Sequence, residues 1–272
     1  MRVAAIDLGT NSTRLLVADV VDGRITEVAR ALQITRLGEG VDKRRRLLPV
    51  PIARARNALT EYRRDAERLG AERALLIATS AVRDAENGEA FLGEIEWSYG
   101  FATQLLSGDE EAELTLRGVT SGRALDPGTL VVDIGGGSTE LIQSGWHASL
   151  DVGSVRLTER FGEDADAVRA YVAGLLPDAD VSGALGVAGT ITTLAAVELG
   201  EYDRACVHGY RLGVATVEAQ VEQLAALPLE ERRRVPGLEP ERAPVIVAGA
   251  AILREIMCRY GLDEIEIGRA HV

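Results

Sequence analysis

Lysine, cysteine, histidine and aromatic side chains are all scarce in this sequence of 272 residues. Its 42 acidic residues outnumber the 30 basic ones, among which Lys43 is the single lysine, and the formal net charge is −12. Non-specific binding to nucleic acid depends on many cationic contacts to phosphates, so an acidic chain is a poor candidate for it. We expect no nucleic-acid partner, and an anionic ligand must be bound by a local group of donors.

The cysteines and the apolar runs exclude further classes of protein. Cys206 and Cys258 lie far apart without a CxxC motif, so neither a disulfide framework nor a zinc site is indicated. No apolar run reaches the roughly 18 residues that a membrane span needs, and the N-terminal residues lead into a predicted strand without a signal-peptide pattern. We therefore expect a cytoplasmic protein with no membrane partner.

Strands and helices alternate along the chain. Short apolar runs predict strands at 3–7 and 14–21, and helical spacing from Pro51 to Leu69 predicts a helix that precedes a strand at 74–79. Further strands are predicted at 101–106, 129–133, 138–144, 147–152 and 184–189, and further helices near 86–98, 107–116, 164–175, 190–199, 214–226 and 243–259. This alternation, with 46% hydrophobic residues, predicts an α/β fold.

A short motif occurs twice, one domain's length apart. The stretches DLGTNSTRLL (7–16) and DIGGGSTELI (133–142) share an Asp, a Gly, a Ser-Thr pair and apolar residues at the same offsets. The break TSGRALDPG (120–128) stands between them. We therefore predict an ancient duplication, with similar domains at 1–120 and 121–272 that face each other across a cleft.

Each repeated turn is suited to binding an anion. Glycines between two strands let backbone N–H groups converge, and Ser or Thr hydroxyls add donors. The aspartates that end the preceding strands, Asp7 and Asp133, would lie beside that anion and could hold Mg²⁺ through water. One glycine-rich turn can be only a tight turn, but two with the same pattern favour phosphate binding. The predicted donors to phosphate are Thr10, Asn11, Ser12, Gly136, Gly137, Ser138 and Thr139.

The paired motifs resemble the two phosphate loops of the actin, sugar kinase and heat-shock chaperone superfamily. More narrowly, the sequence resembles the family of exopolyphosphatases and guanosine pentaphosphate phosphohydrolases (Ppx/GppA), in its short two-domain actinobacterial form. The resemblance covers nearly the whole chain and implies two actin-like, ribonuclease H-like domains. The further segments that carry it are TRLGEGVD (35–42), ATSAVRDAENG (78–88), LLSGDEEAEL (105–114), VAGTITTLAA (187–196) and VHGYRL (207–212).

The resemblance implies that Glu111, in LLSGDEEAEL, polarises the water that attacks the phosphate chain. Phosphoanhydride hydrolysis has a loose transition state, so the protein mainly positions an in-line water and neutralises charge. A carboxylate can orient that water as a general base. The alternative is that Glu110, Glu111 and Glu113 only form a solvated acidic first turn of a helix, which the helix dipole favours.

Arg14 and Glu140 stand at the same offset of the two motifs but carry opposite charges. Arg14 would supply positive charge to the phosphates, whereas Glu140 would join Asp133 in holding Mg²⁺ or ordering water. Asp133 and Glu140 are therefore predicted, with Glu111, to be catalytic. A structural alternative pairs Arg14 with Glu140 across the cleft.

Other charged residues have two interpretations each. Arg83 is expected to contact a phosphate, for which a planar and permanent cation is suited, or else to pair with Asp84 or Glu86. The run DKRRR (42–46) could steer a polyanion or simply be solvated. Glu113 departs from the family pattern, which often has Arg there, and this puts in doubt a phosphate contact from its helix.

The resulting expectation is a magnesium-dependent exopolyphosphatase that releases orthophosphate from the ends of inorganic polyphosphate. The alternatives are removal of the terminal phosphate of guanosine pentaphosphate and a non-catalytic polyphosphate or nucleotide sensor. Family resemblance adds a homodimer as an expectation. The last residues, Ile267 to Val272 (IGRAHV), match the translated codons ATC GGA AGA GCA CAC GTC of a sequencing adapter, so we expect adapter read-through on a truncated gene.

Overall fold

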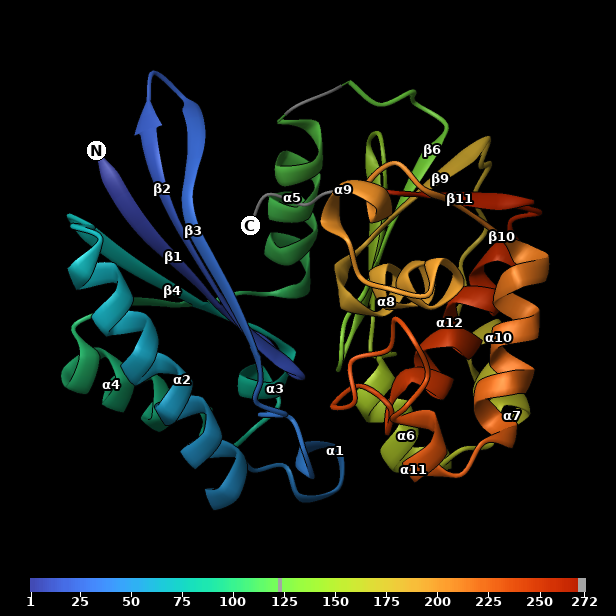
Figure 1. Cartoon of the computed structure of the whole chain (residues 1–272), viewed down its shortest axis with the longest axis horizontal. Helices are drawn as coiled ribbons and strands as arrows, with labels where there is room; N and C mark the ends of the chain where they lie inside the picture. The colour runs from blue at the N-terminus through green and yellow to red at the C-terminus, as the bar shows by residue number, and fades with distance from the viewer. Residues whose placement is uncertain (122–123, 269–272) are drawn as a thin grey trace. The chain divides into compact units, whose positions relative to one another are not determined.

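The computed structural model describes residues 1–121 and 124–268, which form two compact units (Figure 1). The first unit is Met1–Gly108 and the second begins at Asp109. Each unit contains one β-sheet with helices packed on it. The predicted α/β class is therefore confirmed, with two sheets.

Helix α5 (Gly108–Thr120) explains why the division falls before the expected boundary at 120/121. Its buried side chains Ala112 and Val119 pack against apolar residues of the second sheet. Because these contacts tie α5 to the second unit, the helix is not part of the first one.

The first unit is built on a five-stranded sheet with the order β3-β2-β1-β4-β5. The strands are β1 (Arg2–Leu8), β2 (Ser12–Val21), β3 (Arg24–Ile34), β4 (Arg73–Ala78) and β5 (Ala102–Leu105). The pairs β1–β2 and β2–β3 are antiparallel, whereas β1–β4 and β4–β5 are parallel. The sequence did not predict β3, because its side chains are mostly exposed and apolar and polar residues do not alternate regularly in RITEVARALQI.

Helices α2 and α4 pack on one face of this sheet (Figure 1). The helices of the first unit are α1 (Val41–Arg44), α2 (Pro49–Arg68), α3 (Ser80–Arg83) and α4 (Gly88–Tyr99). Leu59 and Tyr62 of α2 join Ile6 and Leu8 of β1 in the buried core. The Tyr62 hydroxyl donates a hydrogen bond to the backbone carbonyl of Thr13 at 2.8 Å. This contact ties α2 to the start of β2, beside the first repeated motif.

The second sheet has the order β10-β11-β9-β6-β7-β8. Its strands are β6 (Thr129–Ile134), β7 (Thr139–Gln143), β8 (Trp146–Leu150), β9 (Gly183–Val187), β10 (Arg211–Gly213) and β11 (Glu264–Ile267). Pairs β6–β7 and β7–β8 are antiparallel, and β6–β9 and β9–β11 are parallel. Strands β8-β7-β6-β9-β11 thus repeat the order and directions of β3-β2-β1-β4-β5. The likeness of the two motifs therefore extends to five strands of each sheet, and β10 is an additional strand of the second sheet.

Helices cover both faces of the second sheet. The large core cluster lies on one face and includes the buried helix α12, while α5 covers the other face (Figure 1). The remaining helices of this unit are α6 (Ser154–Phe161), α7 (Ala165–Ala173), α8 (Ala188–Leu199), α9 (Arg204–Val207), α10 (Val214–Ala226), α11 (Leu229–Arg232) and α12 (Ile246–Arg259).

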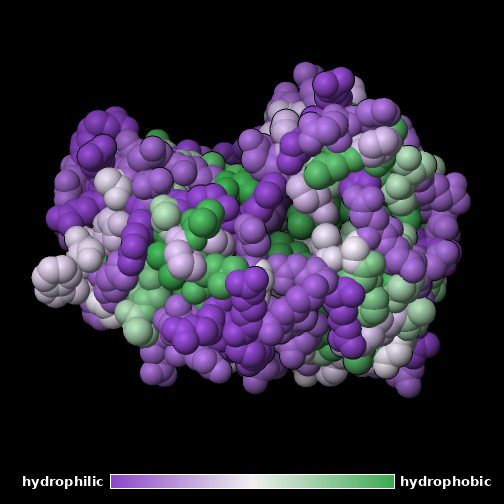
Figure 2. Space-filling view, turned by 90° about the horizontal axis from the view of Figure 1, so that it is seen from below, coloured by the Kyte–Doolittle hydropathy of each residue, from purple (hydrophilic) through white to green (hydrophobic). Residues whose placement is uncertain are grey.

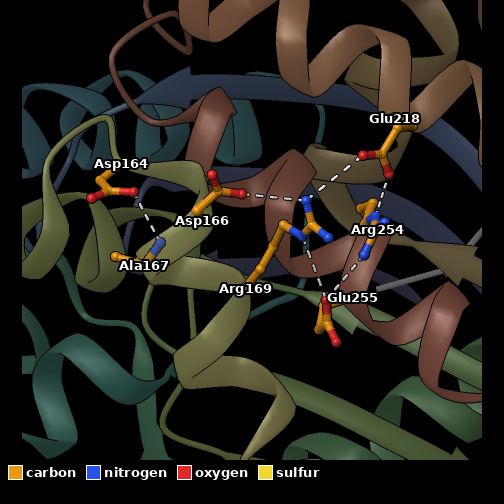
Figure 3. A network of polar contacts seen from close by, with 7 residues as sticks. All are labelled: Asp164, Asp166, Ala167, Arg169, Glu218, Arg254 and Glu255. Atoms are coloured by element: carbon orange, nitrogen blue, oxygen red, sulfur yellow. Dashed lines mark hydrogen bonds and ion pairs between the residues drawn. The ribbon is translucent and has the colours of Figure 1, made fainter.

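A network of ion pairs joins α7, α10 and α12 (Figure 3). Arg169 of α7 lies 3.7 Å from Glu218 of α10 and 3.6 Å from Glu255 of α12. Arg254 of α12 also pairs with Glu218. These side chains are partly buried, so screening by solvent is weaker than for fully exposed pairs. The network fixes the spacing of three helices that carry the core.

Hydrophilic side chains cover most of the face seen in Figure 2, with smaller apolar patches among them. Among the residues that the structure describes, no helix has the length and hydropathy to cross a membrane. Of the expected adapter-derived tail, Ile267 ends β11, and the Gly268 amide donates to the Gly186 carbonyl at 2.7 Å. Residues 269–272 lie outside the described part of the chain.

Candidate active site

The two repeated motifs form equivalent turns in the two sheets. The Gly9 amide donates to the Ser12 carbonyl at 3.0 Å, and the Gly135 amide donates to the Ser138 carbonyl at 3.0 Å. The first turn joins β1 to β2 and the second joins β6 to β7. We call them the first loop (residues 9–12) and the second loop (residues 135–138).

The segment after β3 supports the first loop from behind. The amides of Thr35 and Arg36 donate to the Asn11 carbonyl at 3.1 and 2.9 Å, and the Gly38 amide donates to the Thr10 carbonyl at 2.9 Å. A Cβ at Gly38 would lie 2.2 Å from Thr10 Cγ2, so only glycine fits this close approach. The segment TRLGEGVD is therefore a scaffold for the first loop.

The start of α6 supports the second loop in the same way. Its amides donate to the carbonyls of Gly135 and Gly136 at 2.8 to 3.1 Å, and Arg156 Nε donates to the Gly137 carbonyl at 2.7 Å. In a trans peptide the C=O and the following N–H point in opposite directions. The N–H groups of Gly136, Gly137 and Ser138 therefore point away from α6. The same argument turns the amides of Asn11 and Ser12 away from the scaffold of the first loop.

Asp7 and Arg14 are cross-strand neighbours beside the first loop. Arg14 Nη1 lies 3.7 Å from Asp7 Oδ2. Burial raises the pKa of Asp7, and the Arg14 charge opposes that rise. Because a guanidinium already balances this carboxylate, Asp7 is a weaker candidate for holding Mg²⁺ than the carboxylates of the second unit.

Asp133 and Glu140 occupy the equivalent cross-strand positions beside the second loop. Glu140 is only 4% exposed. Burial, the charge of Asp133 and the charge of Glu111, in that order, raise the pKa of Glu140 well above its ordinary value, against hydrogen bonds from Ser138 and Ser149. Two strands and one helix thus bring three predicted catalytic carboxylates into one electrostatic cluster.

Helix α5 supplies Glu111 to this cluster. Its first turn carries Asp109, Glu110 and Glu111, of which only Glu111 is partly buried. Thr115, one turn later, donates to Asp133 Oδ2 at 3.4 Å and ties the helix to β6. The interpretation as a solvated acidic turn therefore fits Glu110 but not Glu111, whose charge acts on a buried neighbour. Glu113 is exposed and pairs with Arg117 at 2.6 Å.

Three predicted phosphate ligands make structural contacts. Thr139 is fully buried, and its hydroxyl donates to the Val152 carbonyl at 2.6 Å, so this hydroxyl proton is not directed to a ligand. Arg83, at the end of α3, donates to the Leu106 carbonyl at 2.6 Å. Thr10 also has a partner, since its hydroxyl lies 2.8 Å from that of Ser80. The second loop therefore offers backbone amides and Ser138, rather than Thr139, to a phosphate.

Two residues of β8 without a predicted role contact this cluster or the helix beside it. Ser149 Oγ donates to Glu140 Oε1 at 3.0 Å. His147 Nε2 lies 2.9 Å from Asp109 Oδ1, in the first turn of α5. Neither residue belongs to a motif, so the signal that identifies them is the register of β8 against β7.

The donor set suits a hard cation that keeps part of its water shell. Within residues 1–121 and 124–268, no group of three or more His, Cys, Asp or Glu side chains has the arrangement of a complete metal site. Mg²⁺ is commonly held by one or two carboxylates together with waters and substrate phosphates. The partly buried Asp133 and the buried Glu140, whose pKa is raised by burial and by neighbouring carboxylates, fit such a partial site.

Comparison with known proteins identifies the family. The model of the Ppx/GppA phosphatase family matches residues 16–269. The chain is 37% identical to exopolyphosphatase 2 of Mycobacterium tuberculosis, over 98% of this chain and 94% of that protein. It is 30% identical to guanosine-5'-triphosphate,3'-diphosphate pyrophosphatase of Aeromonas salmonicida, over 97% of this chain and 56% of that protein. A crystal structure of an Aquifex aeolicus Ppx/GppA protein superposes with a TM-score of 0.79 at 30% identity, covering 99% of this chain and 94% of the other. The chain therefore belongs to the Ppx/GppA phosphatase family, as the resemblance of its motifs predicted.

Proposed function

We propose that the protein is an exopolyphosphatase, which hydrolyses the terminal phosphoanhydride bond of inorganic polyphosphate and releases orthophosphate. The observation that carries this proposal is the cluster of Glu111, Asp133 and Glu140 beside the amides of the second loop. An anion site next to carboxylates is what hydrolysis of a phosphate chain requires, because a phosphate must be bound and a water oriented. The relative named exopolyphosphatase 2 supports the same substrate.

Glu111 is proposed to orient the attacking water and accept its proton. It lies on a helix whose first turn is held to the sheet, so its carboxylate is pre-positioned. The loop amides of Gly136 and Gly137 would bind phosphoryl oxygens, as would Ser138. In the first unit, the amides of Asn11 and Ser12 and the cation of Arg14 would do the same, and Arg83 remains a predicted contact.

Mg²⁺ is the proposed cofactor, held by Asp133 and Glu140 with water and substrate completing its shell. When bound, it would supply positive charge to the phosphate oxygens. The chain's own contribution is to orient the Glu140 carboxyl toward such a cation by hydrogen bonds from Ser138 and Ser149, which partly oppose the rise of its pKa.

The test is phosphate release from short and long polyphosphate by the wild type and Glu111→Gln, with Mg²⁺. Loss of a general base typically costs about 10²- to 10⁴-fold in rate. The matched control is Glu113→Gln, an exposed carboxylate on the same helix, which should keep wild-type activity. Equal rates for Glu111→Gln and the wild type would remove Glu111 from the mechanism.

Guanosine pentaphosphate is the second candidate substrate, because the chain also matches guanosine-5'-triphosphate,3'-diphosphate pyrophosphatase. The same assay with this nucleotide separates the two. Turnover of the nucleotide alone would make it the substrate, while tight binding of polyphosphate without turnover of either would indicate a sensor. A cytoplasmic location and a homodimer stay predictions, which fractionation and light scattering can test.

A further inference from the structure

Strand β8 presents two polar side chains next to the proposed catalytic carboxylates. Ser149 lies directly opposite Glu140 of β7, and His147 lies two residues earlier, opposite Ile142. Ser149 Oγ donates to Glu140 Oε1 at 3.0 Å. His147 Nε2 lies 2.9 Å from Asp109 Oδ1, and because a carboxylate can only accept, the imidazole N–H is the donor. One strand therefore contacts both the buried carboxylate and the helix that carries Glu111.

We propose that His147 and Ser149 are positioning residues of the active site: Ser149 orients Glu140, and His147 holds the first turn of α5 so that Glu111 stays in place. The inference rests on the proposed hydrolytic function and names residues that act through others. Neither side chain is expected to touch the substrate.

The first sheet provides an internal comparison for Ser149. There the cross-strand row is Asp7, Arg14 and Leu32, and in the second sheet the equivalent row is Asp133, Glu140 and Ser149. Where the middle residue is Arg14, the third strand has a leucine without a donor. Where the middle residue is a buried carboxylate, the third strand has a hydroxyl that bonds it. The hydroxyl therefore occurs where the middle residue is a buried carboxylate, and it is not a feature that both sheets share.

His147 acts at the first turn of α5, ahead of the buried apolar contacts of that helix. The buried apolar contacts of α5 start at Ala112, whereas the preceding residues Asp109 and Glu110 are exposed. The hydrogen bond between His147 and Asp109 ties this turn to β8, and Glu111 follows Asp109 two residues later. A displacement of about 1 Å of a catalytic group can cost about 10²-fold in rate. A hydrogen bond that restrains this turn therefore also restrains the position of Glu111.

The alternative is that the contact of His147 with Asp109 is an ordinary surface pair, which would contribute little to stability and nothing to rate. Steady-state kinetics of His147→Ala and His147→Gln distinguish the two, since Gln retains an N–H donor. We expect kcat of His147→Ala to fall about 10- to 100-fold with KM nearly unchanged, and His147→Gln to recover most of it. The matched control is Arg117→Ala, which removes the exposed pair with Glu113 from the same helix and should leave kcat unchanged.

Ser149 is tested in the same assay with Ser149→Ala and Ser149→Thr. The alanine variant should lose about tenfold in kcat, and threonine, which keeps a hydroxyl, should restore it. Ser144→Ala, in the exposed turn between β7 and β8, is the control. Wild-type kcat in both alanine variants, in a protein whose Glu111→Gln variant is inactive, would overturn the inference and leave the proposed function standing.

Hydrogen exchange gives a readout that does not depend on turnover. The amides of residues 112–114, which donate to the carbonyls of the first turn of α5, should exchange faster in His147→Ala than in the wild type or Arg117→Ala, because the turn has lost its tie to β8. Unchanged exchange in His147→Ala would overturn the positioning role of His147. Absence of turnover in the wild type, with faster exchange in His147→Ala, would refute the proposed function while the contact itself is upheld.

Discussion

Replacement of Glu140 by Gln should make the protein more stable at neutral pH while it abolishes hydrolysis. Burial, with the charges of Asp133 and Glu111, holds the pKa of Glu140 well above the ordinary 4.5. Between 4.5 and the raised pKa, the folded protein binds more protons than the unfolded chain, so the free energy of unfolding falls as pH rises through this window. Gln keeps the shape of the side chain without the charge and should therefore escape this loss.

The size of the gain follows from the same displacement of the pKa. One pKa unit is equivalent to about 1.4 kcal/mol, so a carboxyl raised well above its ordinary value should cost at least that much once it is ionised. For a protein of this size, about 1 kcal/mol moves Tm by roughly 2–4 °C. We expect Glu140→Gln to melt at least about 3 °C higher than the wild type at pH 8, and close to it at pH 4.

Thermal unfolding followed by circular dichroism from pH 4 to 8, with a chelator present, measures this difference. The control is Glu222→Gln, an exposed carboxylate on α10, which should leave Tm unchanged at every pH. Excess Mg²⁺ should raise the Tm of the wild type more than that of Glu140→Gln, because the cation balances the charge that Gln lacks. The reasoning about Glu140 would be refuted if Glu140→Gln had the same Tm as the wild type at pH 8. It would also be refuted if the Tm of Glu140→Gln exceeded that of the wild type by no more than the Tm of Glu222→Gln does.

Three further substitutions test the loops and the helix network. Arg14→Gln removes the cation of the first loop, and initial rates should show a KM for polyphosphate raised about tenfold with kcat nearly constant. An unchanged KM would exclude a contact between Arg14 and phosphate. Gly153→Ala would place a Cβ 2.4 Å from the carbonyl of Gly136, so the second loop must move and activity should fall about 10²-fold. The control is Gly174→Ala, whose new Cβ would lie 3.6 Å from the nearest atom and which should have wild-type activity. Glu218→Gln removes the negative charge that pairs with both Arg169 and Arg254, and the free energy of unfolding measured with denaturant should fall by about 1–2 kcal/mol. An unchanged free energy of unfolding would show that these ion pairs do not stabilise the fold.

The sheets and the long helices could be predicted from local pattern. The hairpin of β1 and β2 is indicated by two apolar runs around a glycine turn, and α2 by a proline at its start and apolar spacing of helical period. Strand β3 could not be found in this way, because it is an edge strand with mostly exposed side chains, and apolar and polar residues do not alternate regularly in its sequence. The place of α5 was also missed, since a helix that follows one sheet in sequence packs on the other.

The candidate site could be predicted as far as its residues lie in motifs. Thr139 was predicted to bind phosphate because it follows Ser138, but side chains alternate along a strand. Thr139 and Leu141 therefore face the large core, whereas Glu140 and Ile142 face α5. This could have been inferred from the period of two. The roles of β8 could not, because they depend on its register against β7, and no local pattern fixes that register.

The residue opposite each aspartate, rather than the glycine turn, sets the chemistry of each loop. Both turns close with the same 3.0 Å bond and are supported from behind by the segment after the third strand. In the first sheet the aspartate faces Arg14, so the pair is balanced and the loop region suits an anion. In the second sheet the aspartate faces Glu140, so two carboxylates lie together and require a proton or a cation between them. A single difference of charge on the second strand therefore gives two otherwise equivalent turns opposite electrostatic surroundings.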